Sequence, residues 1–504
     1  MLSSTAKYLV FFLPILGAAM WLPWTKWGDA ETRRATFLAY IVLTSILFVF
    51  GSPPLKYVLL LVAGLLISPK DPEKRAALFV MLILIIPERF PYYVPFPGIN
   101  YLVILRSDIL FQVFMGLPLL LMSRKKVKDG GALLDILFLG FAVFWAMMLL
   151  RSPETFTSAL RVQVLHVLET VVVYLVLRKW LGSYEGMRAY FTAFFVFLLC
   201  LGALAVLSSA RNWHFYGEIT EFNYLALIRH GGIRLSLQFD PFFLSYMMLT
   251  LGVTLYCLRR WLTLPKLAVF AGVLLALFLA QDTKARTAYL LFVAMFGMLI
   301  YFRLPSLGLR KFVMFGAIVA VFVLFPIALN YDFGSMEGYN SFDYRQRLFE
   351  TAMQKLGQNP LFGDSYYYFD PIFDDLVTGE GFVDFTNSYL QIALGSGIIG
   401  VSLWTGSHIL GIRMAMGNAQ KLRAREDERS KEMVVYGELL AIYGIGIMMM
   451  GLTSSFISFT FEFAVVQVAL CRAYVTAVAR ELAREEVPSE AKQSLPGAYP
   501  QPAE

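Results

Sequence analysis

Apolar runs of nearly 20 residues recur from Tyr8 to Ala477, and this feature decides what the chain can fold into. The apolar core of a bilayer is roughly 30 Å thick and needs about 20 apolar residues per helix. Of the 504 residues, 58% are hydrophobic and only 16% are charged, which excludes an ordinary soluble protein. We therefore expect an all-α polytopic membrane protein of about 12–14 transmembrane helices, in which the first run, 8–24, is a retained span.

Basic residues gather in short connections between the apolar runs. The clusters are Arg124 to Lys128, Arg259 to Lys266, Arg303 to Lys311 and Arg413 to Arg425. Short loops rich in Lys and Arg face the cytoplasm, so the segments 209–235, 282–286 and 330–387 are expected on the periplasmic face of a bacterial inner membrane. Orientation in the membrane explains the net charge of +7, and we expect no nucleic-acid partner. The three cysteines lie in apolar runs, so neither disulfides nor a zinc site are expected.

Residues 1–480 are interpreted as a single transmembrane domain, and the polar, proline-bearing residues 481–504 as a disordered cytoplasmic tail. Within that domain, 330–387 is the one long loop. Between Tyr331 and Thr386 it has ten acidic residues against three basic ones. Its helical periodicity predicts an amphipathic helix from Asp343 to Leu356, with Arg345 on the same face as Leu348 and Phe349.

Three segments, in order along the chain, resemble the signature regions of the O-antigen ligase and O-antigen polymerase superfamily of bacterial membrane glycan transferases. The first is 234–241, RLSLQFDP, and the second is 283–288, TKARTA. The third starts at Arg345 and runs through 359–363, NPLFG, to 387–391, NSYLQ, followed by Gly395, Gly397 and Gly400. The resemblance covers roughly 200–475. One departure is Thr386, which stands where family members typically have a histidine directly before the asparagine.

The resemblance implies transfer of a glycan from an undecaprenyl-diphosphate carrier to a sugar hydroxyl, without a cofactor. Such a reaction needs no metal if guanidinium groups hold the leaving diphosphate. Arg234, Arg286 and Arg345 are the candidates for this clamp, although arginines at helix ends also reach lipid headgroups for purely structural reasons.

Thr386 in place of the histidine favours a polymerase of exopolysaccharide or O-antigen repeats. The alternative is a ligase that transfers a finished glycan to lipid, as in lipopolysaccharide assembly, or to protein. The partners implied are the carrier-linked glycan, membrane lipid, and a chain-length regulator or flippase.

Activation of the acceptor hydroxyl calls for a carboxylate or histidine within reach. On the predicted periplasmic face the sequence offers His230, Asp240, Asp282, Glu380 and Asp384 and does not choose among them. With the third segment included, the candidate catalytic set is Asp240, Asp384, Thr386 and Asn387. An ion pair between Asp240 and Arg234 is an equally good interpretation of Asp240.

Tyr366, Tyr367 and Tyr368 offer flat rings with hydroxyl groups beside acidic residues, and we interpret them as candidate glycan contacts. The competing interpretation is that these rings form a small core within the loop. The glycines after the third segment are interpreted as structural, because small residues permit close packing of helices.

Glu169, Glu438 and Glu462 lie within apolar runs. Carboxylates inside a membrane mark ion or proton pathways in some proteins, so a secondary transporter of a small solute is the alternative from another functional class. The sequence has no visible internal repeat, which a transporter of that kind typically shows.

Overall fold

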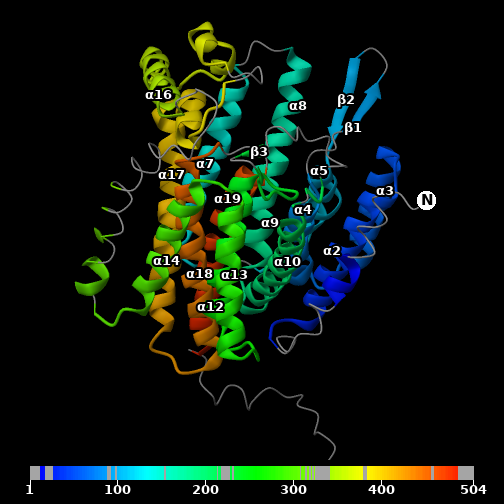
Figure 1. Cartoon of the computed structure of the whole chain (residues 1–504), viewed down its shortest axis with the longest axis vertical. Helices are drawn as coiled ribbons and strands as arrows, with labels where there is room; N and C mark the ends of the chain where they lie inside the picture. Colours follow the sequence, from blue (N-terminus) through cyan, green and yellow to red (C-terminus); the bar gives the residue numbers. More distant parts are fainter. Residues whose placement is uncertain are drawn as a thin grey trace, which may run out of the picture.

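The computed structural model describes residues 12–17, 27–87, 92–96, 99–125, 127–151, 155–212, 214–216, 228–229, 232–306, 308–312, 341–377, 383–455 and 459–485, with isolated helical positions at 315–316, 319 and 323. Most of this described part is helical, and its strands form two short hairpins. Figure 1 shows the helices side by side in one bundle, with α16 at one end.

Eight helices among the described residues are long and apolar enough to cross a membrane. They are α2 (Ala30–Val49), α7 (Ala132–Leu149), the continuous helix α8–η3–α9 (Phe156–His166, Val167–Val172, Val173–Trp180), α10 (Tyr184–Arg211), α12 (Pro241–Leu258), α17 (Ser388–Leu422), α18 (Glu428–Gly451) and α19 (Phe459–Glu485). Shorter helices are α3 (Pro53–Ile67), α4 (Pro72–Ile85), α5–η2–α6 (Ser107–Phe111, Gln112–Gly116, Leu117–Leu121), α13 (Lys266–Asp282) and α14 (Thr287–Arg303). The predicted all-α polytopic fold is confirmed. The count of about 12–14 spans stays a prediction, because 8–24 and 311–329 lie largely outside the described residues.

Short polar side chains begin several helices where the sequence passes from a loop into an apolar run. Asp29, Ser183 and Asp427 each accept a hydrogen bond from the backbone N–H three residues later, at 2.8, 3.0 and 2.8 Å. The first N–H groups of a helix have no partner inside it, so a side-chain oxygen at this position fixes where the helix starts.

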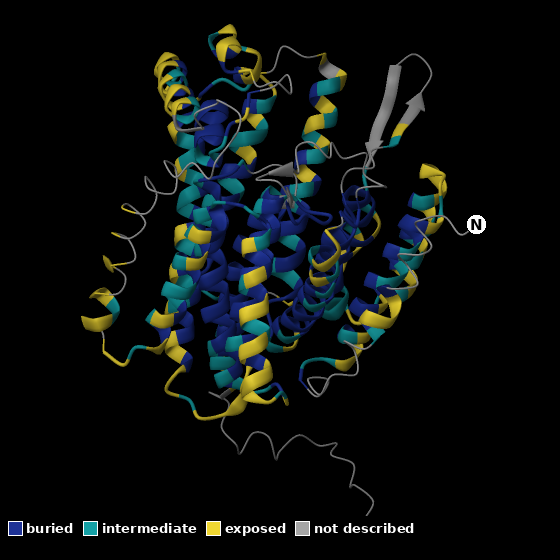
Figure 2. Ribbon diagram, in the orientation of Figure 1, coloured by how far each residue is buried: buried dark blue, intermediate teal, exposed yellow. Residues whose placement is uncertain are grey.

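Four helices form the centre of the bundle. The apolar windows of α10, α12, α18 and α19 are 78, 89, 83 and 94% buried, against 28% for α7. Their aromatic rings interlock, as in the stacked pair Phe191 and Tyr436, whose centroids are 4.3 Å apart. Figure 2 shows this buried centre beside exposed residues on α13, where Leu267, Phe270 and Phe278 are apolar, as expected of a lipid-facing surface.

One predicted span begins differently in the structure. The apolar run 101–122 is long enough to predict a membrane-spanning helix, but 99–105 is strand β2 (Ile99–Leu105), paired antiparallel with β1 (Tyr92–Phe96), and the helix begins at Ser107. The residues Tyr-Leu-Val-Ile-Leu at 101–105 are apolar enough for either structure, and β-branched and aromatic residues favour a strand. This hairpin projects at the end of the bundle that carries α16 (Figure 1).

The predicted basic connections meet at the opposite end. Arg260 pairs with Glu428 at 2.7 Å, while Arg423 and Arg303 both contact Glu438, at 2.7 and 3.3 Å. These ion pairs join connections that are far apart in the sequence, and we call this end of the bundle the basic end.

The long loop contains α16 (Ser341–Gln358), which confirms the predicted helix, followed by the short 3-10 turns η4 (Tyr367–Phe369) and η5 (Pro371–Leu376). The predicted apolar face is partly wrong. Leu348 and Ala352 are buried, but Phe349 is 55% exposed, because the helix packs on the side that also carries Lys355. Residues 330–340 and 378–382, with candidate Glu380, lie outside the described residues.

Helix α19 continues to Glu485, beyond the boundary predicted at residue 480, and the division into a transmembrane domain and a tail stays a prediction. Residues 486–504 of the predicted tail lie outside the described part of the chain.

Candidate functional site

Four segments meet at the end of the bundle opposite the basic end: 234–240, 282–288, 383–388 and 453–455. We call their meeting place the four-segment junction. Leu235 N–H donates to the Asp282 carbonyl at 3.2 Å, and the hydroxyls of Thr287 and Thr453 are 2.9 Å apart. Ser388 Oγ donates to the Ser454 carbonyl at 2.5 Å, and Ser455 Oγ to the Phe385 carbonyl. All three signature segments therefore contribute to one place.

Arg234 is held firmly at this junction. Its side chain is buried, with the residue only 8% exposed, and Nε donates to the Thr283 carbonyl at 3.1 Å. The guanidinium carbon lies 5.2 Å from the centre of the Phe242 ring. Both contacts orient the guanidinium group without neutralising its charge.

Arg286 stands three residues after Thr283 and directly before α14. The turn is tight, since Lys284 has a left-handed φ of 52° and its N–H donates to the Gln281 carbonyl at 2.9 Å. The bond from Arg234 to the Thr283 carbonyl therefore places Arg234 against the turn that carries Arg286. Arg286 itself is half-buried.

Arg345 lies next to Tyr344, and Tyr344 is bonded to the segment 383–388 of the junction. The Tyr344 hydroxyl accepts from the Asp384 N–H at 3.0 Å and donates to the Asp384 carbonyl at 3.3 Å. Asp384 lies four residues before Ser388, so this pair of bonds ties the start of α16 to the third signature segment. Arg345 is half-buried, whereas Arg347 is exposed, as their positions on the helix predicted.

Asn387 and Asp240 both cap helices that begin at the junction. Asn387 accepts from the Leu390 N–H at 3.1 Å, and Oδ1 of Asp240 accepts from the N–H groups of Phe242 and Phe243 at 2.8 and 2.9 Å. This capping role explains why a carboxylate stands directly before an apolar helix. Of the other candidates, Asp384 is exposed, Thr386 and Asp282 are half-buried, and His230 lies outside the described residues.

The NPLFG segment packs against a break in α17. At Gly397 the helix has φ 67° and ψ −169°, and the backbone on either side bonds instead to the turn 359–364. Ile398 N–H donates to the Pro360 carbonyl at 2.8 Å, and Asp364 N–H to the Leu394 carbonyl at 2.6 Å. A side chain at Gly397 would begin only 2.1 Å from the Leu361 carbonyl oxygen, so this position requires glycine. The structural interpretation of the glycines fits this geometry.

The three tyrosines after this turn differ in exposure. Tyr367 is only 4% exposed and packs with Phe373, Phe385 and Leu390 in a small separate core, which supports the competing interpretation for this residue. Tyr366 and Tyr368 are 37% and 47% exposed, and the Tyr368 hydroxyl accepts from Gln391 Nε2 at 2.7 Å. Two of the three rings are thus accessible beside the third signature segment.

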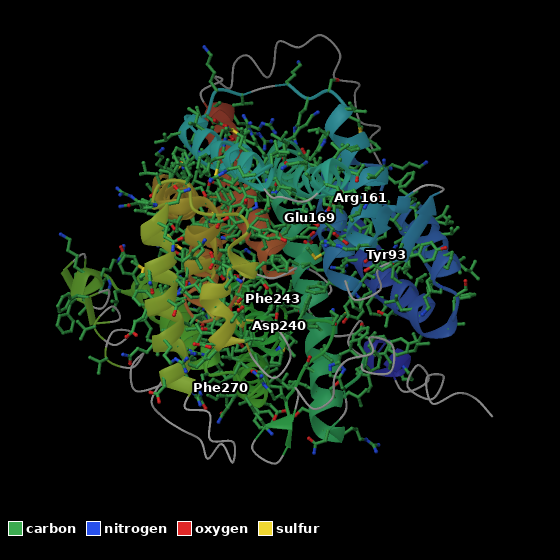
Figure 3. The ribbon with its side chains drawn as sticks, turned by 90° about the horizontal axis from the view of Figure 1, so that it is seen from above. Tyr93, Arg161, Glu169, Asp240, Phe243 and Phe270 are labelled. Atoms are coloured by element: carbon green, nitrogen blue, oxygen red, sulfur yellow. The ribbon has the colours of Figure 1, made fainter. Side chains whose placement is uncertain are left out.

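The carboxylates inside the apolar runs occupy two different places. Glu438 pairs with Arg423 and Arg303 at the basic end, whereas Glu169 and Glu462 lie together with Asp108 in a second cluster. Figure 3 shows Glu169 with Arg161 toward one side of the molecule, apart from Asp240 and Phe243. The three glutamates therefore do not lie together in one place.

No motif in the sequence selects Tyr344, Thr453 and Ser454, which hold the junction together. Serine, threonine and tyrosine are common throughout the chain, and their role depends on which segment lies opposite. An uninterrupted apolar run that ends in Thr453-Ser454-Ser455 at the predicted external face was the one available signal.

Comparison with known families finds a match between residues 246–405 and the O-antigen ligase family model. The match includes the second and third signature segments and begins just after the first. It confirms the resemblance to the O-antigen ligase and polymerase superfamily. A comparison with curated proteins found no match.

Proposed function

We propose that this chain, a membrane glycan transferase of the O-antigen ligase and polymerase superfamily, moves a glycan from an undecaprenyl-diphosphate carrier to a sugar hydroxyl at the four-segment junction. The observation that carries this proposal is the contact of Arg234 with Thr283, three residues before Arg286, together with the bonds between Tyr344 and Asp384 that bring in the start of α16. These contacts support the proposal because they bring the three segments that carry the arginines to one end of the bundle.

The arginines would bind the diphosphate of the donor and stabilise it as it leaves. A guanidinium group never loses its charge at physiological pH and can bond two phosphate oxygens at once. Three helices, α12, α14 and α17, also begin at the junction, and the N-terminus of a helix favours an anion. Fixed cations and helix ends together would supply the charge that a metal ion provides in other phosphate-handling enzymes.

Asp384 is the best candidate for the base among the residues considered. Its backbone is fixed by Tyr344 while its side chain is exposed, whereas Oδ1 of Asp240 is engaged in capping α12. In the proposed step the acceptor hydroxyl passes its proton to the Asp384 carboxylate and its oxygen bonds the anomeric carbon of the donor. The bond from that carbon to the phosphate oxygen breaks, and the carrier leaves with its diphosphate. Thr386 and Asn387 would position the acceptor, and Asp240 would hold α12 in place.

Tyr366 and Tyr368 are the proposed glycan contacts, because both rings are exposed and the Tyr368 hydroxyl bonds Gln391 of the third signature segment. Aromatic faces with hydroxyl groups suit the mixed apolar and polar surface of a sugar. Tyr367 is better assigned to the core of the loop.

Within this reaction class we favour polymerisation of exopolysaccharide or O-antigen repeats over ligation of a finished glycan, because Thr386 replaces the family's histidine. The active face would be periplasmic, at the end opposite the basic connections, in the bacterial inner membrane. A chain-length regulator and a flippase would be the partners in such a pathway.

The test is to express Arg286→Ala and Arg345→Ala in a strain that lacks the native gene and to analyse both surface and carrier-linked glycan. Loss of one cation from the clamp is expected to lower transfer by about 10²–10³-fold, so that carrier-linked glycan accumulates. Arg347→Ala is the matched control, because Arg347 is on the same helix as Arg345 but exposed. Single repeats on the carrier would indicate a polymerase and long polymer a ligase. Unchanged surface polymer in both variants would overturn the proposal.

A further inference from the structure

Three carboxylates form a cluster away from the junction, where α5, η3 and the first turns of α19 come together. The nearest oxygens of Asp108, Glu169 and Glu462 all lie within 4.8 Å of one another. Asp108 and Glu462 are buried, with 1% and 2% of the residue exposed. Three negative charges this close inside an apolar bundle repel one another strongly and must be compensated.

One cation is already present in the cluster. Arg106 bonds both oxygens of Asp108, at 3.1 and 2.6 Å, which makes a complete bidentate pair. Its Nη2 also lies 2.7 Å from Glu169 Oε1 and 3.8 Å from Glu462 Oε1. A single guanidinium therefore serves three carboxylates, and in their ionised form two negative charges remain.

A fourth oxygen ligand is available beside Glu462. Gln112 is fully buried, and its Nε2 donates to Glu462 Oε1 at 3.3 Å, so the amide is aimed into the cluster. Its own carbonyl oxygen, Oε1, has no hydrogen-bond partner among the residues that the structure describes. A buried amide oxygen without a partner is unfavourable, and a bound cation would offset this cost.

The geometry points to a binding site for one divalent cation, formed by Asp108, Glu169, Glu462 and the Gln112 carbonyl oxygen. Its charge would balance the two negative charges that Arg106 leaves. The ligands are all oxygens of the hard type preferred by Ca²⁺ and Mn²⁺. Because these oxygens lie within 4.8 Å of one another, one ion can contact all of them at the roughly 2.3–2.6 Å that is usual for Ca–O.

The backbone at this place is also unusual. Gln112 and Glu169 each lie in a π-helical stretch, Gln112–Gly116 and Val167–Val172, inside otherwise α-helical segments. Such stretches reposition side chains and often accompany functional sites. Glu169 and Arg106 have side chains that are 18% and 23% exposed, which gives an ion a route to the cluster.

Binding of the metal alone tests this inference without reference to glycan transfer. Full-length protein in detergent, freed of metal by a chelator, is titrated with Mn²⁺ while free Mn²⁺ is measured by electron paramagnetic resonance. One saturable site per chain is expected, and Glu169→Gln and Glu462→Gln are expected to weaken it by about 10-fold or more. Ca²⁺ should compete for the site and raise the unfolding temperature of the native protein.

Glu432→Gln is the matched control, because Glu432 is a buried glutamate elsewhere that accepts hydrogen bonds from Trp27, Tyr184 and Tyr436. If a charge-removing variant does not fold, Gln112→Met removes only the amide at nearly constant volume and must still weaken binding. The inference is overturned if the native protein has no saturable Mn²⁺ site, or if binding is equal in the native protein and these variants.

Discussion

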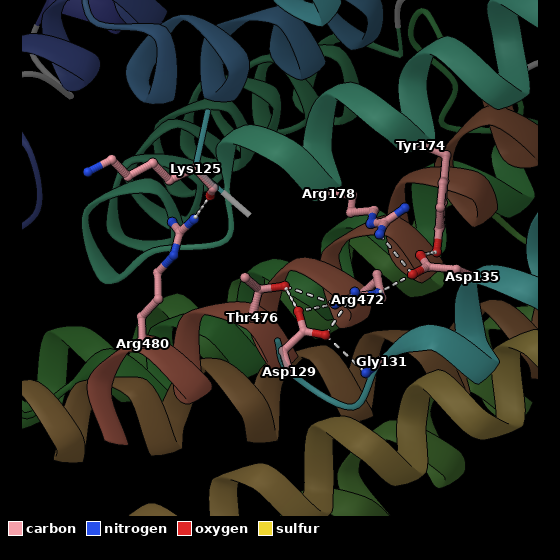
Figure 4. Close-up of polar contacts among 9 residues, drawn as sticks. All are labelled: Lys125, Asp129, Gly131, Asp135, Tyr174, Arg178, Arg472, Thr476 and Arg480. Atoms are coloured by element: carbon pink, nitrogen blue, oxygen red, sulfur yellow. Dashed lines mark hydrogen bonds and ion pairs between the residues drawn. The ribbon is translucent and has the colours of Figure 1, made fainter. Parts of the chain in front are cut away.

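The buried arginines at the two ends of the bundle are held by different kinds of partner. At the basic end, Arg472 is 4% exposed and lies between two carboxylates. It bonds Asp129 at 2.7 and 3.0 Å and Asp135 at 3.0 Å, as Figure 4 shows. At the junction, Arg234 is equally buried, but its described contacts are a backbone carbonyl and an aromatic ring.

This difference separates a structural cation from a candidate binding cation. The charge of Arg472 is used to join α19 to the segment 129–135. Burial alone would raise the pKa of Asp129, but hydrogen bonds from Arg472 and Thr476 outweigh it and hold that pKa below its ordinary value. The contacts of Arg234 with the Thr283 carbonyl and the Phe242 ring instead fix the direction of its guanidinium group, which our proposal assigns to the donor diphosphate.

Replacing Arg472 with alanine gives the largest expected loss of stability. The change leaves Asp129 partly buried without its cation, while Asp135 keeps its ion pair with Arg178, and the cost is about 3–5 kcal/mol. We expect low yield and a markedly lower unfolding temperature in detergent, measured by tryptophan fluorescence. Arg480→Ala on the same helix is the control, since its 3.4 Å bond to the Lys125 carbonyl is exposed. Equal stability of the two variants would mean that the ion-pair network does not hold this end together.

Replacing Arg234 with alanine tests the other half of the comparison. Glycan transfer should fall by about 10²-fold while the protein remains inserted and folded. Arg234→Lys should not restore activity, because an ammonium group cannot make the bidentate contact. Arg310→Ala is a close control, because Arg310 also donates to a carbonyl, that of Leu304 at 2.8 Å, and lies over a ring, that of Tyr301, but at the basic end. Equal transfer in the two variants would contradict the special role of the junction.

It was easier to predict from the sequence which segments share one face than which contacts join them. Orientation by the basic loops predicts one face for Arg234, Arg286 and Arg345, because all three lie in or beside segments expected to be periplasmic, and their role in binding stays a prediction. Nothing local to the chain indicates that Tyr344 bonds Asp384 or that Ser388 bonds Ser454, since both contacts depend on packing between distant segments.

Hydropathy also could not decide secondary structure within short apolar stretches. The strand at 99–105 and the exposed Phe349 were missed because an apolar residue suits a strand, a helix or a lipid surface equally well. The sequence likewise does not predict that Asp108, Glu169 and Glu462 cluster, because the segments that meet there are far apart along the chain. For example, 350 residues separate Gln112, beside Asp108, from its partner Glu462.

Gly397→Ala should have a smaller effect, confined to the junction end. The backbone at Gly397, with φ 67° and ψ −169°, lies in a region that is populated almost only by glycine and costs about 1–3 kcal/mol for a residue with a side chain, and the new methyl group would collide with the Leu361 carbonyl. We expect a lower unfolding temperature and reduced transfer, because the turn 359–364 would be pushed away from the break in α17. Gly417→Ala on the same helix has no neighbour within 4 Å and should be neutral or slightly stabilising. Identical behaviour of the two variants would show that the contact between the turn 359–364 and the break in α17 contributes neither to stability nor to transfer.

The smallest expected effect concerns the ion pair within the long loop, which resembles the basic end in chemistry but not in burial. A hydrogen bond from Lys355 and the N–H of Ile372 lower the pKa of Asp370 below its ordinary value of 3.8. Since the folded state lowers this pKa, the pair stabilises the loop above pH 4 and loses that contribution as the pH falls through the lowered value. The contribution is about 1 kcal/mol or less, because Asp370 is partly exposed.

Hydrogen exchange of the amides at 364–376, corrected for its intrinsic pH dependence, should be flat from about pH 5 to 8 and accelerate in stronger acid. In Lys355→Met most of that acceleration should disappear, and a profile equal to the native one would show that the ion pair does not stabilise the loop.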